Sequence, residues 1–302
     1  MDVVIPWLEE LVNFISNKKQ SNNLSNSIVI PVKDHKSMAY LAPKITKAIL
    51  CNQNPACNKC KNCQLVDIKS HPNAYQINPD KSQISIETTR ALQENLHKNI
   101  NNHSHSVIIF MQAHLMNTFA ANSILKLIEE PESHAIFIFL TNNTSNILST
   151  IKSRSHIYHA PTPNITELTN WINQNNTNKV NLSEKQTKWL LEFMNDELLL
   201  LDYINNNQYQ KIIKCKENWI KCIKQRKISL HLLELTEEMP EISLNIFYFI
   251  MQNKFKEKLT NNLNNKFNLN FLPEFIISKN SLCNKKYKET YLILQNLINK
   301  AY

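Results

Sequence analysis

The chain has 302 residues, of which 42% are hydrophobic and 20% charged, and its formal net charge is +9. This length allows two or three domains with sizeable cores. No apolar run approaches the roughly 18 residues of a membrane span, and the first residues lack the basic flank and the small-residue cleavage site of a signal peptide. We therefore expect a cytoplasmic protein that does not span a membrane.

Glycine is absent from the sequence, although average usage of about 7% would give roughly 21 residues. A positive φ angle and close approach of the backbone to a phosphate are easy only for a residue without a Cβ. The composition therefore excludes a working glycine-rich phosphate loop or dinucleotide fingerprint. At turns that usually contain glycine we expect Asn, Asp or Lys at positive φ, at a cost of about 1–3 kcal/mol for each strained residue.

The first 160 residues alternate short β-rich runs with helical patterns, which predicts an α/β domain with a parallel sheet. Buried strands are predicted at residues 27–30, 107–111 and 135–140. Helices are predicted at residues 38–49, 85–96 and 119–130. Within the first of these helices, Pro43 is expected to cause a kink or to shorten the helix.

Two prolines, Pro161 and Pro163, interrupt this alternation, and the sequence after them has helical patterns only. We therefore predict three domains. An α/β domain spans residues 1–161, a small helical domain spans 162–205, and a larger helical domain spans 206–302. The asparagine-rich stretch near residue 205 marks the second boundary.

Four of the seven cysteines lie between residues 51 and 63, with the spacing C-x5-C-x2-C-x2-C. They are Cys51, Cys57, Cys60 and Cys63. Short polar loops between four thiolates are typical of a closed tetrahedral zinc site, and an iron–sulfur cluster is the alternative that uses the same ligands. A site filled by four cysteines has no open coordination position, so its role would be structural.

Two longer runs extend these observations, SHPNAYQINPDKSQISIETTRAL from residue 70 and AANSILKLIEEPESHAIFIFLTNNTSNILSTIKSRS from residue 120. Together with the cysteine cluster they resemble the bacterial DNA polymerase III clamp-loader subunits of the AAA+ class. The resemblance covers residues 7 to about 160, and NKKYKETYLILQNLI near the C-terminus resembles the family's last helix. The length and the residues Pro6-Trp7-Leu8 favour the delta prime type over the larger motor subunit.

The resemblance implies an AAA+ nucleotide-fold domain with a zinc insert, a helical lid and a helical collar. It implies a stator that hydrolyses no ATP itself and helps to load the sliding clamp on primed DNA. The implied partners are the gamma and tau motor subunits and the delta subunit. Two other classes stay open: an ATP-hydrolysing motor subunit, and a stand-alone zinc-containing DNA-binding protein.

The nucleotide site of the family provides a test of these classes. A functional phosphate loop needs G-x-x-x-x-G-K-[ST], whereas the matching segment here, residues 31–37, ends in Lys36-Ser37 and has no glycine. Asp34 adds a negative charge where phosphates would bind. Met111-Gln112 replaces the acidic pair that would hold magnesium. We therefore expect neither ATP binding nor ATP hydrolysis by this chain.

Ser153-Arg154-Ser155 matches the family's Ser-Arg-Cys motif, whose arginine reaches the ATP of a neighbouring motor subunit. The resemblance therefore implies that Arg154 acts in trans as an arginine finger, with Ser155 in place of the usual cysteine. Lys152 provides a second cation nearby. The alternative is that Arg154 simply pairs with a surface carboxylate, since such ion pairs are common.

Three further features have ordinary structural interpretations. Asn142 matches the family's sensor residue, and we expect it to bond local backbone groups. The adjacent Glu129 and Glu130 diverge on a helix, so they are assigned to the helix end before a proline. The basic segment 211–227 is interpreted as a packed helix with a solvated face, with contact to nucleic acid and an interface role for Trp219 as alternatives.

Overall fold

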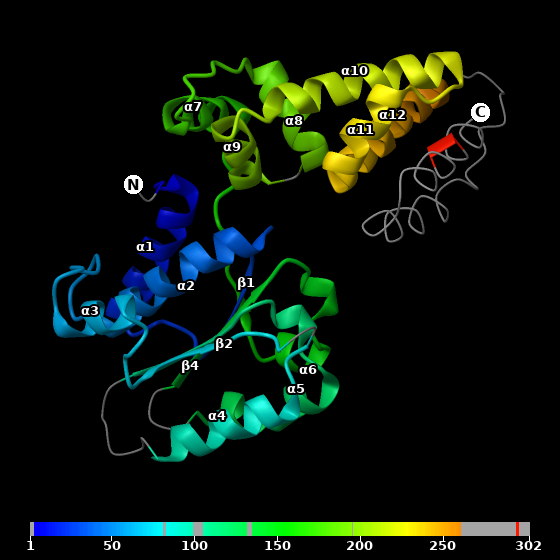
Figure 1. Ribbon diagram of the computed structural model, residues 1–302. Coiled ribbons are helices and arrows are strands. Elements are labelled where there is room, and N and C mark those ends of the chain that lie inside the picture. Colours follow the sequence, from blue (N-terminus) through cyan, green and yellow to red (C-terminus); the bar gives the residue numbers. More distant parts are fainter. Residues whose placement is uncertain are drawn as a thin grey trace. The chain divides into compact units, whose positions relative to one another are not determined.

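The computed structural model describes residues 3–80, 83–98, 105–131, 135–194, 196–260 and 294–295 (Figure 1). The chain divides into two compact units, residues 1–163 and residues 164–302. A further division of the second unit near residue 205 stays a prediction. None of the described helices combines the length and the hydrophobicity that are needed to cross a bilayer.

The first unit is built on a five-stranded parallel sheet, which confirms the predicted α/β class. Its strand order is β2-β3-β4-β1-β5. The strands are β1 (Ser27–Pro31), β2 (Ala74–Ile77), β3 (Ser106–Phe110), β4 (Ala135–Thr141) and β5 (His156–Ile157). The three predicted strands are the central ones, β1, β3 and β4. The two edge strands were not predicted, because β2 is only partly buried and β5 has two residues.

Helices cover both faces of this sheet (Figure 1). On one face lie α1 (Pro6–Gln20), α2 (His35–Leu50) and α3 (Lys61–Asp67), and on the other lie α4 (Ile86–Lys98), α5 (Thr118–Glu129) and α6 (Ser149–Lys152). Two short 3-10 turns, η1 (Ala113–Leu115) and η3 (Thr144–Asn146), complete the described elements of this unit. Helix α2 continues through Pro43, so this residue does not shorten it.

The core under α4, α5 and α6 contains aromatic side chains from β3 and β4. Phe110, Phe137 and Phe139 are fully buried, and the rings of Phe110 and Phe139 stack with their centroids 5.0 Å apart. Complete burial of such a side chain stabilises the fold by about 1.5–3 kcal/mol relative to exposure. Ile128 of α5 and Ile151 of α6 belong to the same cluster, so this core holds both helix ends in place.

The described part of the second unit consists of helices, as the sequence predicts. They are α7 (Ile165–Asn175), α8 (Glu184–Met194), α9 (Glu197–Asn205), α10 (Tyr209–Gln225), α11 (Leu230–Glu238) and α12 (Pro240–Thr260). A capping box formed by Asn164 and Glu167 begins α7. Apart from two residues, the predicted last helix lies outside the described residues.

Helix α10 has the apolar face predicted for the basic segment 211–227. Trp219 on this face is fully buried, donates from Nε1 to Ser243 Oγ at 2.9 Å, and lies 4.7 Å from the Phe247 ring. It is therefore a core residue of its own unit, and its interpretation as an interface anchor is wrong. Several lysines of α10, among them Lys214 and Lys221, are exposed.

Candidate functional site

The four clustered cysteines converge at the junction of α2 and α3. Cys51 caps the C-terminus of α2, Cys57 lies in the connecting loop, Cys60 caps the N-terminus of α3, and Cys63 lies within it. All four Sγ atoms lie within 4.8 Å of one another. The Sγ atom of Cys51 is 3.7 Å from that of Cys57 and 3.9 Å from that of Cys60.

This geometry fits one tetrahedral metal ion. Zn–S bonds of about 2.3 Å place tetrahedral sulfur atoms about 3.8 Å apart, close to the two distances above. Backbone N–H groups also point at the sulfur atoms: Cys60 N donates to Cys57 Sγ at 3.3 Å. Such bonds, chiefly from Lys59 and then from Cys60, lower the pKa of Cys57 to about 6. Burial raises the pKa of Cys63 to about 12, so without a metal ion this thiol keeps its proton at neutral pH.

The degenerate phosphate loop follows β1, where the sequence places it. Asp34 caps the N-terminus of α2, and its carboxylate accepts from Ser37 N at 2.7 Å and from Ser37 Oγ at 2.6 Å. A helix N-terminus attracts anions because its N–H groups and dipole are positive there. Here an internal carboxylate takes that position and also binds the hydroxyl that would otherwise contact magnesium. Lys36 lies on the exposed side of the same turn.

The residues that match the family's acidic pair and sensor residue lie near this loop. Met111 is buried, and its backbone N–H donates to the carbonyl of Ile77 at 2.8 Å. Gln112 has a left-handed backbone, with φ of 50°. Asn142 is exposed, and the local bonds expected of it are made by Asn143, whose side-chain oxygen accepts from Ser145 N at 2.9 Å. The expectation for Asn142 was therefore wrong by one residue.

The Ser-Arg-Ser turn is fixed to the sheet through its last residue. Ser155 Oγ donates to the carbonyl of Ile151 at 2.8 Å and lies 2.6 Å from Ser27 Oγ at the start of β1. Since a hydroxyl has one hydrogen, the Ser27 hydroxyl is the donor in the second contact. A serine in place of the family's cysteine thus joins the turn to β1.

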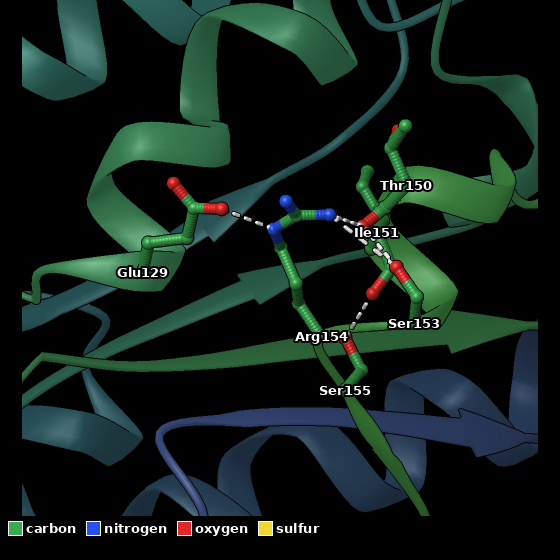
Figure 2. Close-up of polar contacts among 6 residues, drawn as sticks. All are labelled: Glu129, Thr150, Ile151, Ser153, Arg154 and Ser155. Atoms are coloured by element: carbon green, nitrogen blue, oxygen red, sulfur yellow. Dashed lines mark hydrogen bonds and ion pairs between the residues drawn. The ribbon is translucent and has the colours of Figure 1, made fainter.

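Arg154 makes three polar contacts (Figure 2). Its Nε donates to Glu129 Oε1 at 2.5 Å, and its Nη1 lies 3.1 Å from the Thr150 carbonyl and 3.3 Å from Ser153 Oγ. The side chain is 38% exposed. The sequence alternative, pairing with a surface carboxylate, is therefore present in the structure. Lys152 is exposed, and within the described residues it does not take part in these contacts.

Arg154 and the degenerate loop lie at opposite ends of the sheet. Arg154 is near the N-terminal ends of the parallel strands, and the loop is at their C-terminal ends. In the parallel pairing of β1 and β5, Ile28 aligns with His156. Arg154, two residues before His156, therefore lies near the start of β1, whereas residues 32–34 follow its end. The five residues of β1 separate these positions by roughly 17 Å, at about 3.3 Å per residue. Arg154 is thus too far away to act on a ligand in the loop of its own chain.

Comparison with known proteins identifies relatives of this chain. The chain is 27% identical over 182 residues to DNA polymerase III subunit delta prime of Buchnera aphidicola from Schizaphis graminum, which covers 59% of this chain and 55% of the relative. It is 24% identical over 174 residues to the Escherichia coli subunit delta prime, covering 56% and 52%. The matches thus span about half the length of these curated relatives.

A family profile described as "DNA polymerase III, delta subunit" matches residues 7–164. The chain belongs to the delta prime family of DNA polymerase III. A solved structure with a similar fold is a gamma subunit-related protein from Thermotoga maritima, at a TM-score of 0.51 and 15% identity, covering 95% of this chain and 99% of that one. The cysteine insert, the degenerate loop and the Ser-Arg-Ser turn all lie within the part that matches the family.

Two contacts in this delta prime family chain were not found from the sequence. Glu129 was assigned only to a helix end, and Ser27 only to a strand. Both are distant in sequence from Arg154 and Ser155, and only the packing of α5 and β1 brings them together. The exposed Arg154 and the E-E-P pattern before the third predicted strand were the available signals, but neither specifies a partner.

Proposed function

We propose that this chain acts as the delta prime subunit of a bacterial DNA polymerase III clamp loader. In this role it binds and hydrolyses no ATP of its own. It serves as a stator and presents Arg154 to ATP bound by a neighbouring motor subunit. Its partners are the gamma and tau subunits and the delta subunit, and through them the sliding clamp and primed DNA. This function places it in the cytoplasm, with the replication machinery.

The placement of Arg154 is the observation that carries this proposal. The arginine lies where the strands begin, and the loop in which Asp34 occupies the N-terminus of α2 lies where they end. An arginine suits a trans role because its planar, permanently charged guanidinium can stabilise charge that develops on a γ-phosphate. Asp34 occupies the loop of this chain, and Arg154 lies at the opposite end of the strands. Its guanidinium is therefore available to a neighbouring subunit.

The cysteine cluster completes the proposal as a structural zinc site. Four thiolates around one ion leave no coordination position for a substrate. The site joins the end of α2 to the start of α3 through Cys51 and Cys60. Zinc there would hold the loop between them, residues 52–59, against α2. The sulfur separations favour one ion over an iron–sulfur cluster, because bridging sulfides would spread the cysteines further apart.

The test is the ATPase rate of a loader reconstituted from this chain and its partner subunits, measured with clamp and primed DNA. We expect Arg154→Ala to lower the stimulated rate by about tenfold or more, because arginine fingers contribute about 10³–10⁵ in rate at a single site. We expect the isolated chain to be inactive and not to bind ATP. Gel filtration of the reconstituted complex shows whether assembly is unchanged.

Two results would contradict the proposal. Hydrolysis of ATP by the isolated chain would favour a motor subunit. An unchanged rate for an assembled loader that contains Arg154→Ala would exclude the trans role. The exposed lysines of α10 provide the remaining alternative, and strong salt-dependent DNA binding by the isolated chain would favour a stand-alone DNA-binding protein.

A further inference from the structure

The guanidinium of Arg154 is held by two of its three nitrogens. Nε is bonded to Glu129, and Nη1 lies within hydrogen-bond distance of the Thr150 carbonyl and the Ser153 hydroxyl. Within the described parts of the chain, Nη2 has no hydrogen-bond partner, and Figure 2 shows it on the side away from Thr150 and Ser153. The two N–H donors of Nη2 therefore remain for a ligand.

The groups that hold Arg154 are themselves fixed by the core. Glu129 is the last residue of α5, and Thr150 lies in α6. Their neighbours Ile128 and Ile151 are buried in the same hydrophobic cluster. The two helix ends therefore form a rigid support on which the side chain is placed. The carbonyl groups at a helix C-terminus carry partial negative charge, which also favours a cation at this position.

The geometry points to Glu129 as the positioning residue of Arg154. Its carboxylate holds Nε so that the unbonded Nη2 group is presented, already ordered, to the γ-phosphate of ATP on the neighbouring subunit. This inference rests on the proposed trans role of Arg154. It adds a second residue to that site and assigns the ordering of the side chain to the isolated chain rather than to assembly.

Two physical considerations support a positioning role. An unrestrained arginine side chain has considerable rotamer entropy, part of which would otherwise be lost when the phosphate binds. The ion pair itself is exposed, with the two side chains 38% and 48% accessible. Exposed pairs contribute little to stability. Loss of Glu129 should therefore disorder the finger without unfolding the protein.

The test compares Glu129→Ala, Glu129→Gln and Glu130→Gln in the reconstituted loader, with clamp and primed DNA. Glu130 is the adjacent exposed residue and serves as the matched control. We expect Glu129→Ala to lower kcat by roughly two- to fivefold with an unchanged KM for ATP, as suits the loss of one exposed charged contact. Glu129→Gln keeps an oxygen acceptor for Nε and should recover part of the loss. Glu130→Gln should behave like the wild type.

A double-mutant cycle separates positioning from a structural effect. If Glu129 acts only through Arg154, then Glu129→Ala causes no further loss in a chain that already contains Arg154→Ala. Thermal unfolding of each variant chain, with a midpoint close to that of the wild type, shows that the fold is kept. A general weakening of the fold would instead lower the rate in both backgrounds.

The outcomes are distinct for the two proposals. If Arg154→Ala changes nothing, the trans role itself fails. If Arg154→Ala lowers the rate but Glu129→Ala does not, only the positioning role is overturned. A higher rate for Glu129→Ala or Glu129→Gln would also overturn it, because the carboxylate would then be competing with the phosphate for Arg154.

Discussion

The two ends of the parallel sheet, where its strands begin and where they end, have opposite electrostatic character. Where β1 ends, the chain binds its own helix N-terminus with Asp34, and Ser37 is bonded to that carboxylate through both its N–H and its hydroxyl. Where β1 begins, Ser27 and Ser155 fix a turn from which Arg154 projects with part of its surface exposed. At the C-terminal end of the strands, Asp34 occupies the position where an anion would bind. At the N-terminal end, Arg154 presents a cation.

The separation of these two sites indicates that each can change without the other. The full length of a strand separates the loop at Asp34 from the turn at Arg154. Within the described residues, no hydrogen bond or ion pair joins them. Substitutions that close the loop therefore leave the turn unaffected. In the proposed function, the loop has lost a role that acts within the chain, and the turn has kept a role that acts between chains.

The largest expected effect concerns the end of α2 that lies away from both features, at the cysteine cluster. Cys63→Ser removes a buried ligand, and we expect the bound zinc to fall from one ion per chain to almost none. The free energy of unfolding should drop by several kcal/mol, because binding of a structural zinc ion is coupled to folding. Metal analysis and urea unfolding measure both quantities. Cys283→Ser, at a cysteine outside the cluster, is the control and should keep the metal.

The second prediction compares the turn at Arg154 with the degenerate loop directly. Arg154→Lys keeps the charge but loses the planar fork, so the stimulated loader ATPase should fall by about tenfold or more. Lys36→Met changes the lysine that matches the last lysine of the family's phosphate loop. The rate should stay within about twofold of the wild type, because in the proposed function no phosphate binds there. Equal losses for the two variants would mean that the loop of this chain is active, which would break the comparison.

The third prediction tests whether Asp34 has become a structural residue. Asp34→Ala removes the N-cap of α2, and the free energy of unfolding should decrease by about 1–2 kcal/mol. Asp34→Asn keeps a capping oxygen and should lose much less. Neither variant should gain ATP binding in equilibrium dialysis, since the glycine backbone that surrounds phosphates is absent. Tight ATP binding by Asp34→Ala would show that the carboxylate alone closes the loop.

Much of the fold could be predicted from the sequence because its strongest signals are local. Continuous apolar runs identified the three inner strands, and the cysteine spacing identified a candidate metal site at which four sulfur atoms converge. The edge strands were missed because β2 is half exposed and β5 is too short to have a pattern. Helix α1 was not predicted as an element, although Pro6 at its first turn is a typical start signal.

The candidate site was only partly predictable for a different reason. The position of Arg154 follows from a motif, but its contacts with Glu129 depend on the packing of α5 against α6. The pairing of Ser155 with Ser27 depends on the register of β1 and β5. These contacts join residues far apart in the chain, and a single sequence contains no pattern that links such positions.

The smallest expected effect concerns the turns of a chain without glycine. Among the described residues, positive φ is adopted by three asparagines and by Lys69, Gln112, Lys179 and Arg226. Asn and Lys were expected there, whereas Gln and Arg were not, and the expected Asp is absent from the described set. Non-glycine residues have a steric cost in this conformation because Cβ approaches the following carbonyl oxygen.

Lys69 provides the clearest test of that cost. It follows α3 in a Schellman motif, in which Lys69 N bonds to the Val66 carbonyl at 3.0 Å and Ser70 N bonds to the Leu65 carbonyl at 2.9 Å. Lys69→Gly should raise the free energy of unfolding by about 0.5–1 kcal/mol, since relief of strain exceeds the added entropy of the unfolded chain. Lys69→Ala retains the Cβ and should bring no gain. A higher urea midpoint for the glycine variant alone, at an unchanged m-value, would show that the turn is strained by its side chain and that the chain tolerates this strain.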